Sequence, residues 1–286
     1  MTPAAAAFAG GFAAALATLP LAWKWQLGMA RCTVGLAAIA IVGGAAAAAV
    51  GGVTGVSSGA CAALGVAFTG VGAFAVLAYR FYRDPERTAP EGDGLIVSPA
   101  DGEIVYVKRS RDGRLPVACK HGAAVALEEL THTPVHDREA VVIGIAMSFL
   151  DVHVNRAPIA GRVVLSRHFP GRFGSLRRPE MAFENERTTT LLAGTKVEVA
   201  VVQIASRLVR QIRSYVSDGD QVTRGQRIGV IRLGSQVDVV IPGRRDLCVL
   251  VSEGDRVRAG TSVIATVGVA PISIGPPARA LAPGAV

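Results

Sequence analysis

The chain has 286 residues, of which half are apolar, only 18% are charged and 5% are aromatic, and its mean hydropathy is +0.40. Soluble domains carry about 25% charged residues, so this composition excludes a disordered chain and argues against a purely cytosolic protein. The formal net charge is +8. A basic excess suits nucleic acid, an anionic membrane surface or solubility alone, and the distribution of charge has to decide among them.

The first 79 residues are almost free of charge. They contain no Asp or Glu, and Lys24 and Arg31 are their only basic residues. Three apolar stretches lie here, each close to the ~20 residues that cross a hydrocarbon core: about residues 4–23, 32–50 and 60–79. We therefore expect residues 1–79 to form an α-helical membrane anchor of two or three transmembrane helices.

Basic and aromatic residues border these stretches and predict an orientation. Lys24 and Arg31 follow the first stretch, and Arg80 and Arg83 follow the third. The positive-inside rule then places the first loop and everything after Arg80 in the cytoplasm, with the N-terminus outside. A cleaved signal peptide fits poorly, because no Lys or Arg precedes the first stretch. We expect an inner-membrane protein with a cytoplasmic domain.

From residue 93 onward the pattern changes to short β-branched runs separated by turn residues, which is typical of a mostly antiparallel β domain. Residues 204–215 are compatible with one short helix. The fold class predicted is a mainly β (α+β) soluble domain over residues 80–286, preceded by the α-helical membrane anchor. The expected strands are 95–97, 103–107, 141–145, 163–165, 197–204, 227–232 and 237–241.

A weak internal repeat lies within this domain. Residues 216–225 and 251–260 share six identities in ten positions, at an offset of 35. Each copy reads as a strand, a Gly-Asp turn and a final glycine, and glycine suits a turn with positive φ. Such units occur in biotinyl/lipoyl-like β domains, so the repeat indicates a fold and no particular chemistry.

Most of the candidate reactive residues are unremarkable when they are taken singly. The four cysteines are scattered with no CxxC pair, which makes a disulfide framework or a structural zinc site improbable. His132 and His136 are separated by Pro134, and a solvated loop explains them better than a metal site. Gly234-Ser235 by itself has little meaning, Asp101 precedes Gly102 as in an ordinary turn, and His153 lies in a strand-like segment.

Several segments, taken in order, nevertheless resemble the phosphatidylserine decarboxylase family, in its shorter bacterial and archaeal type. The resemblance covers about residues 80–245 and rests on motifs that together are far more specific than any one of them. They are Phe-Tyr-Arg-Asp-Pro-Glu-Arg at 81–87, Ser-Pro-Ala-Asp-Gly at 98–102, residues 147–158 with Gly161, Asn-Glu-Arg at 185–187, Val-Gln-Ile-Ala at 202–205 and Leu-Gly-Ser-Gln-Val-Asp-Val at 233–239.

The resemblance implies a pyruvoyl group made from the chain itself, with no metal and no pyridoxal phosphate. Ser235 would attack the carbonyl of Gly234, and elimination and hydrolysis would leave chains 1–234 and 235–286, which stay together as a heterodimer. Glycine permits the strained backbone that this acyl shift needs. The pyruvoyl carbonyl would form a Schiff base with the substrate amine and act as an electron sink while carbon dioxide leaves.

Three further residues receive roles from the resemblance. Asp101 matches the aspartate of an Asp–His–Ser self-cleavage triad, and His153 matches a histidine tied to substrate binding and decarboxylation. In the longer branch of the family a second histidine, three positions on, is the triad base, whereas this chain has Arg156 there. Arginine is no base at neutral pH, so either His153 serves both steps or the base comes from elsewhere. Arg156 could hold the substrate's phosphate or carboxylate.

The function implied is decarboxylation of phosphatidylserine to phosphatidylethanolamine in phospholipid biosynthesis, with membrane phosphatidylserine as the partner and no nucleic acid. Two alternatives remain at this point. One is a catalytically silent, membrane-anchored adaptor with a biotinyl-like β domain, against which stands the absence of a modifiable lysine motif. The other is a decarboxylase of archaetidylserine, an archaeal ether lipid, because the sequence does not read lipid tails.

Overall fold

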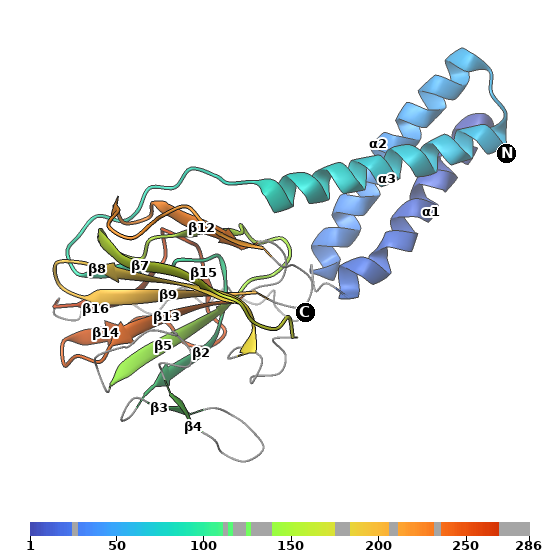
Figure 1. Ribbon diagram of the computed structural model, residues 1–286. Helices are drawn as coiled ribbons and strands as arrows, with labels where there is room; N and C mark the ends of the chain where they lie inside the picture. Colours follow the sequence, from blue (N-terminus) through green and yellow to red (C-terminus); the bar gives the residue numbers. More distant parts are fainter. Residues whose placement is uncertain are drawn as a thin grey trace, which may run out of the picture.

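The computed structural model describes residues 1–24, 28–110, 114–116, 124–126, 139–174, 184–205, 211–231 and 236–268. Three long helices precede a β domain and project from one end of it (Figure 1). They are α1 (Pro3–Lys24), α2 (Met29–Thr54) and α3 (Ser58–Tyr82). Among the described residues, these three helices are long and apolar enough to cross a membrane.

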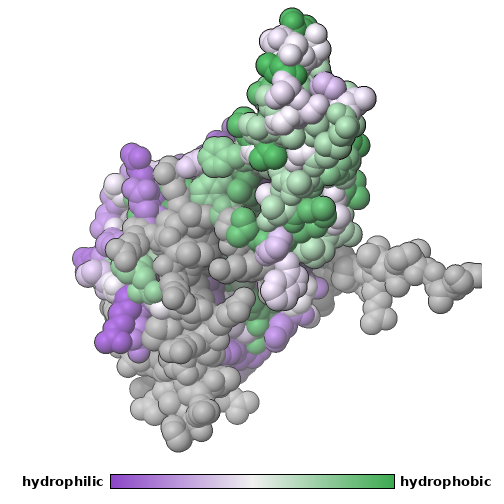
Figure 2. Space-filling model, turned by 90° about the vertical axis from the view of Figure 1, so that its right-hand side faces the viewer, coloured by the Kyte–Doolittle hydropathy of each residue, from purple (hydrophilic) through white to green (hydrophobic). Residues whose placement is uncertain are grey.

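The three helices form a bundle through backbone contacts at small residues. A Cβ on Gly65 of α3 would lie 2.0 Å from the carbonyl oxygen of Ala7 in α1, and a Cβ on Gly10 would lie 2.1 Å from that of Ala62. Glycine therefore lets α1 and α3 approach more closely than any other residue allows, as is common between membrane helices. Large apolar side chains cover the outside of the bundle (Figure 2), including Phe12, Val34, Val53 and Phe74.

The β domain is built around an eight-stranded antiparallel sheet with the order β11-β7-β8-β9-β13-β5-β2-β15. Two three-stranded sheets, β1-β16-β14 and β10-β12-β6, and a hairpin, β3-β4, complete it. The strands of the large sheet are β2 (Gly102–Arg109), β5 (Ala140–Ala146), β7 (Gly161–Phe169), β8 (Arg187–Ala193), β9 (Glu198–Ile204), β11 (Gln221–Val222), β13 (Gln236–Pro242) and β15 (Arg256–Val257). The others are β1 (Leu95–Val97), β3 (Arg114–Pro116), β4 (Ala124–Ala126), β6 (Val154–Arg156), β10 (Ile212–Ser214), β12 (Arg227–Ile231), β14 (Leu247–Val249) and β16 (Val263–Val267).

The internal repeat occupies the two edges of the large sheet. The first copy supplies β11, which pairs with β7, and the second supplies β15, which pairs with β2. Their turns match bond for bond: the carboxylates of Asp220 and Asp255 accept from the amides of Ser217 and Ser252, at 2.9 and 2.8 Å. The final glycines, Gly225 and Gly260, have φ of 82° and 75°, as the repeat predicted. Two short strands thus close edges that would otherwise be open to pairing.

The central strands bury both faces of the sheet because successive side chains alternate. Odd-numbered residues of β5, β9 and β13 join the main core, and even-numbered ones form a smaller cluster on the opposite face. The sheets β1-β16-β14 and β10-β12-β6 supply residues to the main core. Strand β13, which lies between β9 and β5, is therefore held from both sides.

The strand predictions and the antiparallel arrangement are confirmed, with boundaries that differ by a few residues. The possible helix over 204–215 is wrong where it can be compared, since Ile204 ends β9 and Ile212–Ser214 is strand β10, paired with β12. Residues 206–210 lie outside the described residues. Pairing with β12 decided the conformation of this segment, and a tertiary contact of that kind leaves no local signal.

Candidate functional site

His153 lies at the junction between the β domain and the end of helix α3. Its carbonyl accepts from the amide of Ile231 at 3.1 Å, and its ring is 4.8 Å from that of Phe81, between centroids. The residue is 2% exposed. Among the described residues, neither ring nitrogen meets the geometry of a hydrogen bond. Buried polar groups are usually hydrogen-bonded, so a ligand or another part of the chain could supply the partner of this imidazole.

Burial lowers the pKa of His153 below its ordinary value of 6.5, because the charged form loses its hydration. The charge of Arg83 lowers the pKa further. Three contributions raise it: the carboxylate of Asp151, the backbone of Asp151, which is near the ring without meeting hydrogen-bond geometry, and the carboxylate of Asp101. Burial is the largest cause and prevails. The imidazole is therefore mostly neutral at pH 7, the form that can accept a proton.

Asp101 is held by four hydrogen bonds in a turn just before β2. Its carboxylate accepts two from the guanidinium of Arg87, at 2.5 and 2.8 Å, and others from the amides of Ala259 at 2.8 Å and Val152 at 3.4 Å. The last contact joins it to the residue next to His153. The pKa of Arg87 is raised, chiefly by the side-chain hydrogen bond between its guanidinium and Asp101. Asp101 is thus linked to His153 through the backbone amide of Val152, and its negative charge raises the pKa of the imidazole.

The segment 81–87, which begins in the last turn of helix α3, contacts the three candidate residues that the structure describes. Phe81 packs on His153, and Arg87 binds Asp101. Asp84 bonds to Arg156 at 3.2 Å and to Arg227 of β12 at 2.5 Å. The motif at 81–87, to which the sequence assigned no role, therefore forms a strap: a segment that connects helix α3 to the candidate site.

Arg156 is buried in β6, with a guanidinium committed mainly to the chain itself. It donates to the carbonyls of Gly225 at 2.9 Å and Pro85 at 3.0 Å, besides Asp84. Its Nε has no hydrogen-bond partner among the described residues. The structure thus places Arg156 three residues from His153, facing the strap, and its role toward substrate stays a prediction.

Two amide side chains from other family motifs organise the same region. The Gln203 amide of β9 donates to Asn155 Oδ1 at 2.8 Å, and Asn155 Nδ2 reaches the carbonyl of Pro99 at 3.4 Å. Both residues are completely buried. They link β6, which follows His153, to the turn that carries Asp101, so each supports the backbone of a candidate residue.

A second buried polar cluster lies on the other face of the large sheet and was missed by sequence reasoning. The carboxylate of Asp238 accepts from Tyr106 Oη at 2.6 Å and from Gln236 Nε2 at 2.7 Å, and Gln236 also donates to Tyr106 Oη at 2.8 Å. Burial raises the pKa of Asp238 to about 6 and lowers that of nearby Arg187 to about 10. Asp238 and Arg187 belong to motifs quoted above, but their spacing gave no sign that they would meet across three strands.

Gly234 and Ser235 lie outside the described residues, and so do His121, His132 and His136. The residues that flank the predicted cleavage site are described. Ile231 ends β12 beside His153, and Gln236 begins β13 between Ala146 and Ile204. Ile231 thus lies beside His153, and Gln236 lies in the centre of the large sheet. No cluster of three metal-ligating side chains occurs among the described residues.

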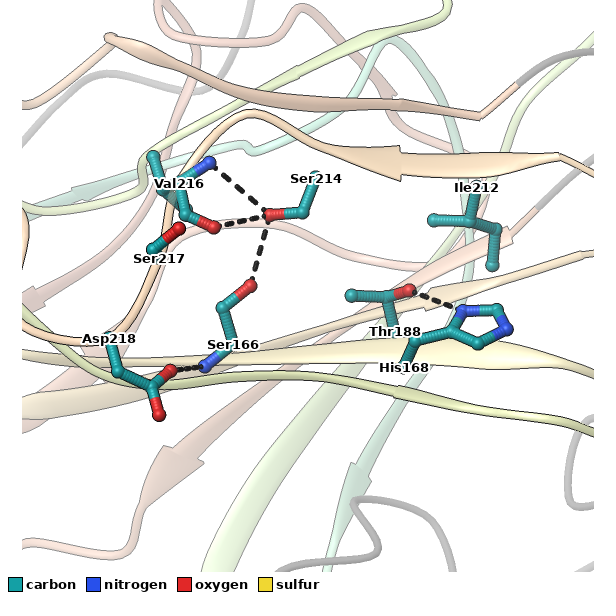
Figure 3. Close-up of a pocket in the computed structure, with 8 residues that line it drawn as sticks. All are labelled: Ser166, His168, Thr188, Ile212, Ser214, Val216, Ser217 and Asp218. Carbon is teal, nitrogen blue, oxygen red and sulfur yellow. Dashed lines mark hydrogen bonds between the residues drawn. The ribbon is translucent and has the colours of Figure 1, made fainter.

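A polar pocket of about 480 Å³ lies between β7, β8 and β10. Figure 3 shows its hydroxyls bonded to one another: Ser166 to Ser214 at 3.0 Å, and Thr188 to His168 at 3.2 Å. Asp218 accepts from the Ser166 amide at 2.6 Å. None of the eight lining residues is Lys or Arg, the residue types that an anionic headgroup needs, so we assign this pocket no role.

Comparisons with known proteins point to one family. A family model described as phosphatidylserine decarboxylase matches residues 74–265. A Methanocaldococcus jannaschii protein, named as a candidate archaetidylserine decarboxylase proenzyme, is 40% identical over 65% of this chain and 87% of its own length. Phosphatidylserine decarboxylase proenzymes of Pelobacter propionicus and Geotalea uraniireducens are 38% and 36% identical over 66% and 64% of this chain, and 76% of their own length in each case.

Proposed function

The chain belongs to the phosphatidylserine decarboxylase family, and we propose that it converts phosphatidylserine to phosphatidylethanolamine in phospholipid biosynthesis. The observation that carries the proposal is the contact of one segment, 81–87, with His153, Asp101 and Arg156, at the end of a helix that can span a membrane. The family match also disfavours the silent adaptor. A lipid substrate would explain both the apolar helices and the position of the candidate site at the end of α3.

We propose that the chain is a proenzyme that cuts itself after Gly234 and leaves a pyruvoyl group at residue 235. Two features support such a group. The ring nitrogens of His153, which lies beside Ile231, have no hydrogen-bond partner among the described residues, and Gln236 is paired with a strand on each side. When present, the pyruvoyl group supplies a carbonyl that condenses with the substrate amine and withdraws electrons. The fragments 1–234 and 235–286 would remain associated, because β13 lies between β9 and β5 of the larger fragment.

We propose that His153 moves protons in both stages. In self-cleavage it accepts the hydroxyl proton of Ser235, which suits an imidazole with a lowered pKa. In turnover the substrate carboxylate would leave as carbon dioxide, with the bonding electron pair drawn toward the carbonyl, and His153 in its protonated form would deliver a proton to the former Cα. Asp101 orients the backbone at Val152 and provides negative charge near the imidazole during cleavage.

Arg156 is proposed to contact the phosphate or carboxylate of the substrate through its Nε, which has no hydrogen-bond partner among the described residues. We further propose that the domain boundary lies near residue 80 and that the β domain faces the cytoplasm at an inner membrane. The basic residues Lys24, Arg31, Arg80 and Arg83 support this orientation. The matched turns of the two repeat copies support their description as biotinyl/lipoyl-like units.

A second substrate merits the same assay, because one similar protein is named for archaetidylserine. Both lipids present the same phosphoserine headgroup and differ in their tails. Purified protein would be given vesicles of either lipid, and the ethanolamine product measured. Turnover of archaetidylserine alone would replace phosphatidylserine as the substrate, and turnover of neither would refute the proposed function.

Intact mass tests maturation directly. The wild-type chain should appear as two fragments, the smaller of 52 residues (286 − 234), with a blocked N-terminus. Ser235→Ala should remain one chain and lack activity, and Asp101→Ala should accumulate precursor. His153→Ala should show both the cleavage defect and loss of turnover, and its cleavage and decarboxylation at wild-type rates would remove His153 from the mechanism.

A further inference from the structure

The last turn of helix α3 covers the imidazole of His153. Phe81 lies 4.8 Å from the imidazole ring, at an interplanar angle of 46°, and stacks on Phe149 at 5.3 Å with an angle of 29°. Its neighbours Tyr79 and Tyr82 are 72% and 68% exposed, whereas His153 is 2% exposed. One aromatic side chain of this turn therefore points into the β domain while others point out.

The attachment of this turn does not rest on the ring alone. Arg83 Nη2 donates to the carbonyl of Leu150 at 3.0 Å, so α3 holds both ends of the segment 149–153. Beyond it, Asp84 and Arg87 bind Arg156 and Asp101. Because these contacts come from one short segment of the chain, the positions of the candidate residues depend on where the end of α3 lies.

We propose that the membrane helix is part of the decarboxylation site, with Phe81 as a positioning residue that keeps the imidazole of His153 dry and oriented. The inference rests on the proposed function for its consequence in turnover and on geometry for its effect on the ring. Exposed tyrosines beside Arg80 are typical of a helix end at a membrane–water interface. His153 then lies at the depth of lipid headgroups, so a phosphoserine can meet it without leaving the bilayer.

The proposal predicts a change in the acid–base behaviour of His153. Burial is the main cause of its lowered pKa. The charged groups that face it are Asp151, Asp101 and Arg83, and a change at Phe81 removes none of them. A polar side chain of similar size to leucine at position 81 would hydrate the ring, and the pKa of His153 would rise toward 6.5.

Two variants of nearly equal size separate apolar cover from simple packing. Phe81→Asn should raise the pKa of His153 and move the alkaline limb of the decarboxylation profile, where the protonated imidazole is lost, to higher pH, whereas Phe81→Leu should stay close to wild type. A rise of half a pH unit in the pKa raises the protonated fraction about threefold on that limb. Phe74→Asn is the matched control, since Phe74 lies on the same helix and is 71% exposed.

The pKa would be followed by histidine ring NMR on full-length Ser235→Ala protein in lipid nanodiscs, with His153→Gln identifying the signal. This readout does not need turnover. An unchanged pKa in Phe81→Asn, with an active wild type, overturns this inference and leaves the proposed function intact, whereas an inactive wild type removes the function alone. If Phe81→Asn does not accumulate as folded protein, Phe81→Ala replaces it with the same two outcomes.

Discussion

The ion pair between Asp101 and Arg87 should be a strong local contribution to the stability of the β domain. Its side chains are only 10% and 11% exposed, and two hydrogen bonds join them. Loss of one partner from a buried pair costs about 3–5 kcal/mol, because the other charge stays desolvated. Since Arg87 keeps the carbonyl of Ala259 at 2.8 Å, we expect Asp101→Asn to cost about 3 kcal/mol, at the lower end.

A double-mutant cycle isolates this pair. Asp101→Asn, Arg87→Met and the double variant would be made in the Ser235→Ala precursor, so that every protein has the same covalent state. Thermal unfolding in detergent should show Tm losses of about 6–12 °C for Asp101→Asn, at about 2–4 °C per kcal/mol for a domain of this size. The double variant should lose little more than either single one, which gives a coupling energy of about 2 kcal/mol or more.

The matched control is the exposed pair Arg244–Asp246, with both side chains 42% exposed. Solvent screens such a pair, so Asp246→Asn should leave Tm unchanged within error. Additive losses at Asp101 and Arg87, or an Asp101→Asn loss no larger than the control, would refute the assignment of a buried pair. With Ser235 restored, Arg87→Met should still cleave while Asp101→Ala does not, which separates stability from catalysis.

Two further predictions concern the anchor and the second polar cluster. Gly65→Leu should separate α1 from α3, because a Cβ at that position meets the carbonyl of Ala7. The variant should therefore make the three helices more sensitive to protease in detergent. Gly70→Leu is the control and should not, because a Cβ at that position has nothing within 4 Å. For Asp238, the native pKa of about 6 exceeds the ordinary 3.8, so the native state binds more protons and its stability should fall as pH rises from about 4 to 6. Tyr106→Phe removes a donor to the carboxylate and should raise that pKa further, which carboxyl carbon NMR would show; an unchanged titration would contradict the assigned hydrogen bond.

The three apolar helices and the strand pattern could be predicted from the sequence alone. Twenty-residue apolar runs and β-branched alternation are local properties, and each follows from how backbone groups and apolar side chains are satisfied. The positive φ of the final glycine in each repeat copy was predictable for the same reason. The family was readable because several motifs recur in order, and the comparisons confirm it.

The meeting of these motifs required the tertiary structure. The sequence indicated Asp101, His153 and Arg156 but gave no sign that Phe81, Asp84 and Arg87 would each contact one of them. Nor did spacing show that Tyr106 would reach Asp238, a contact that needs Gly144: a Cβ at that position would lie 2.4 Å from the tyrosine ring. Such contacts depend on strand order and register across the sheet, which fix which distant residues become neighbours and which ionisable groups lose their water.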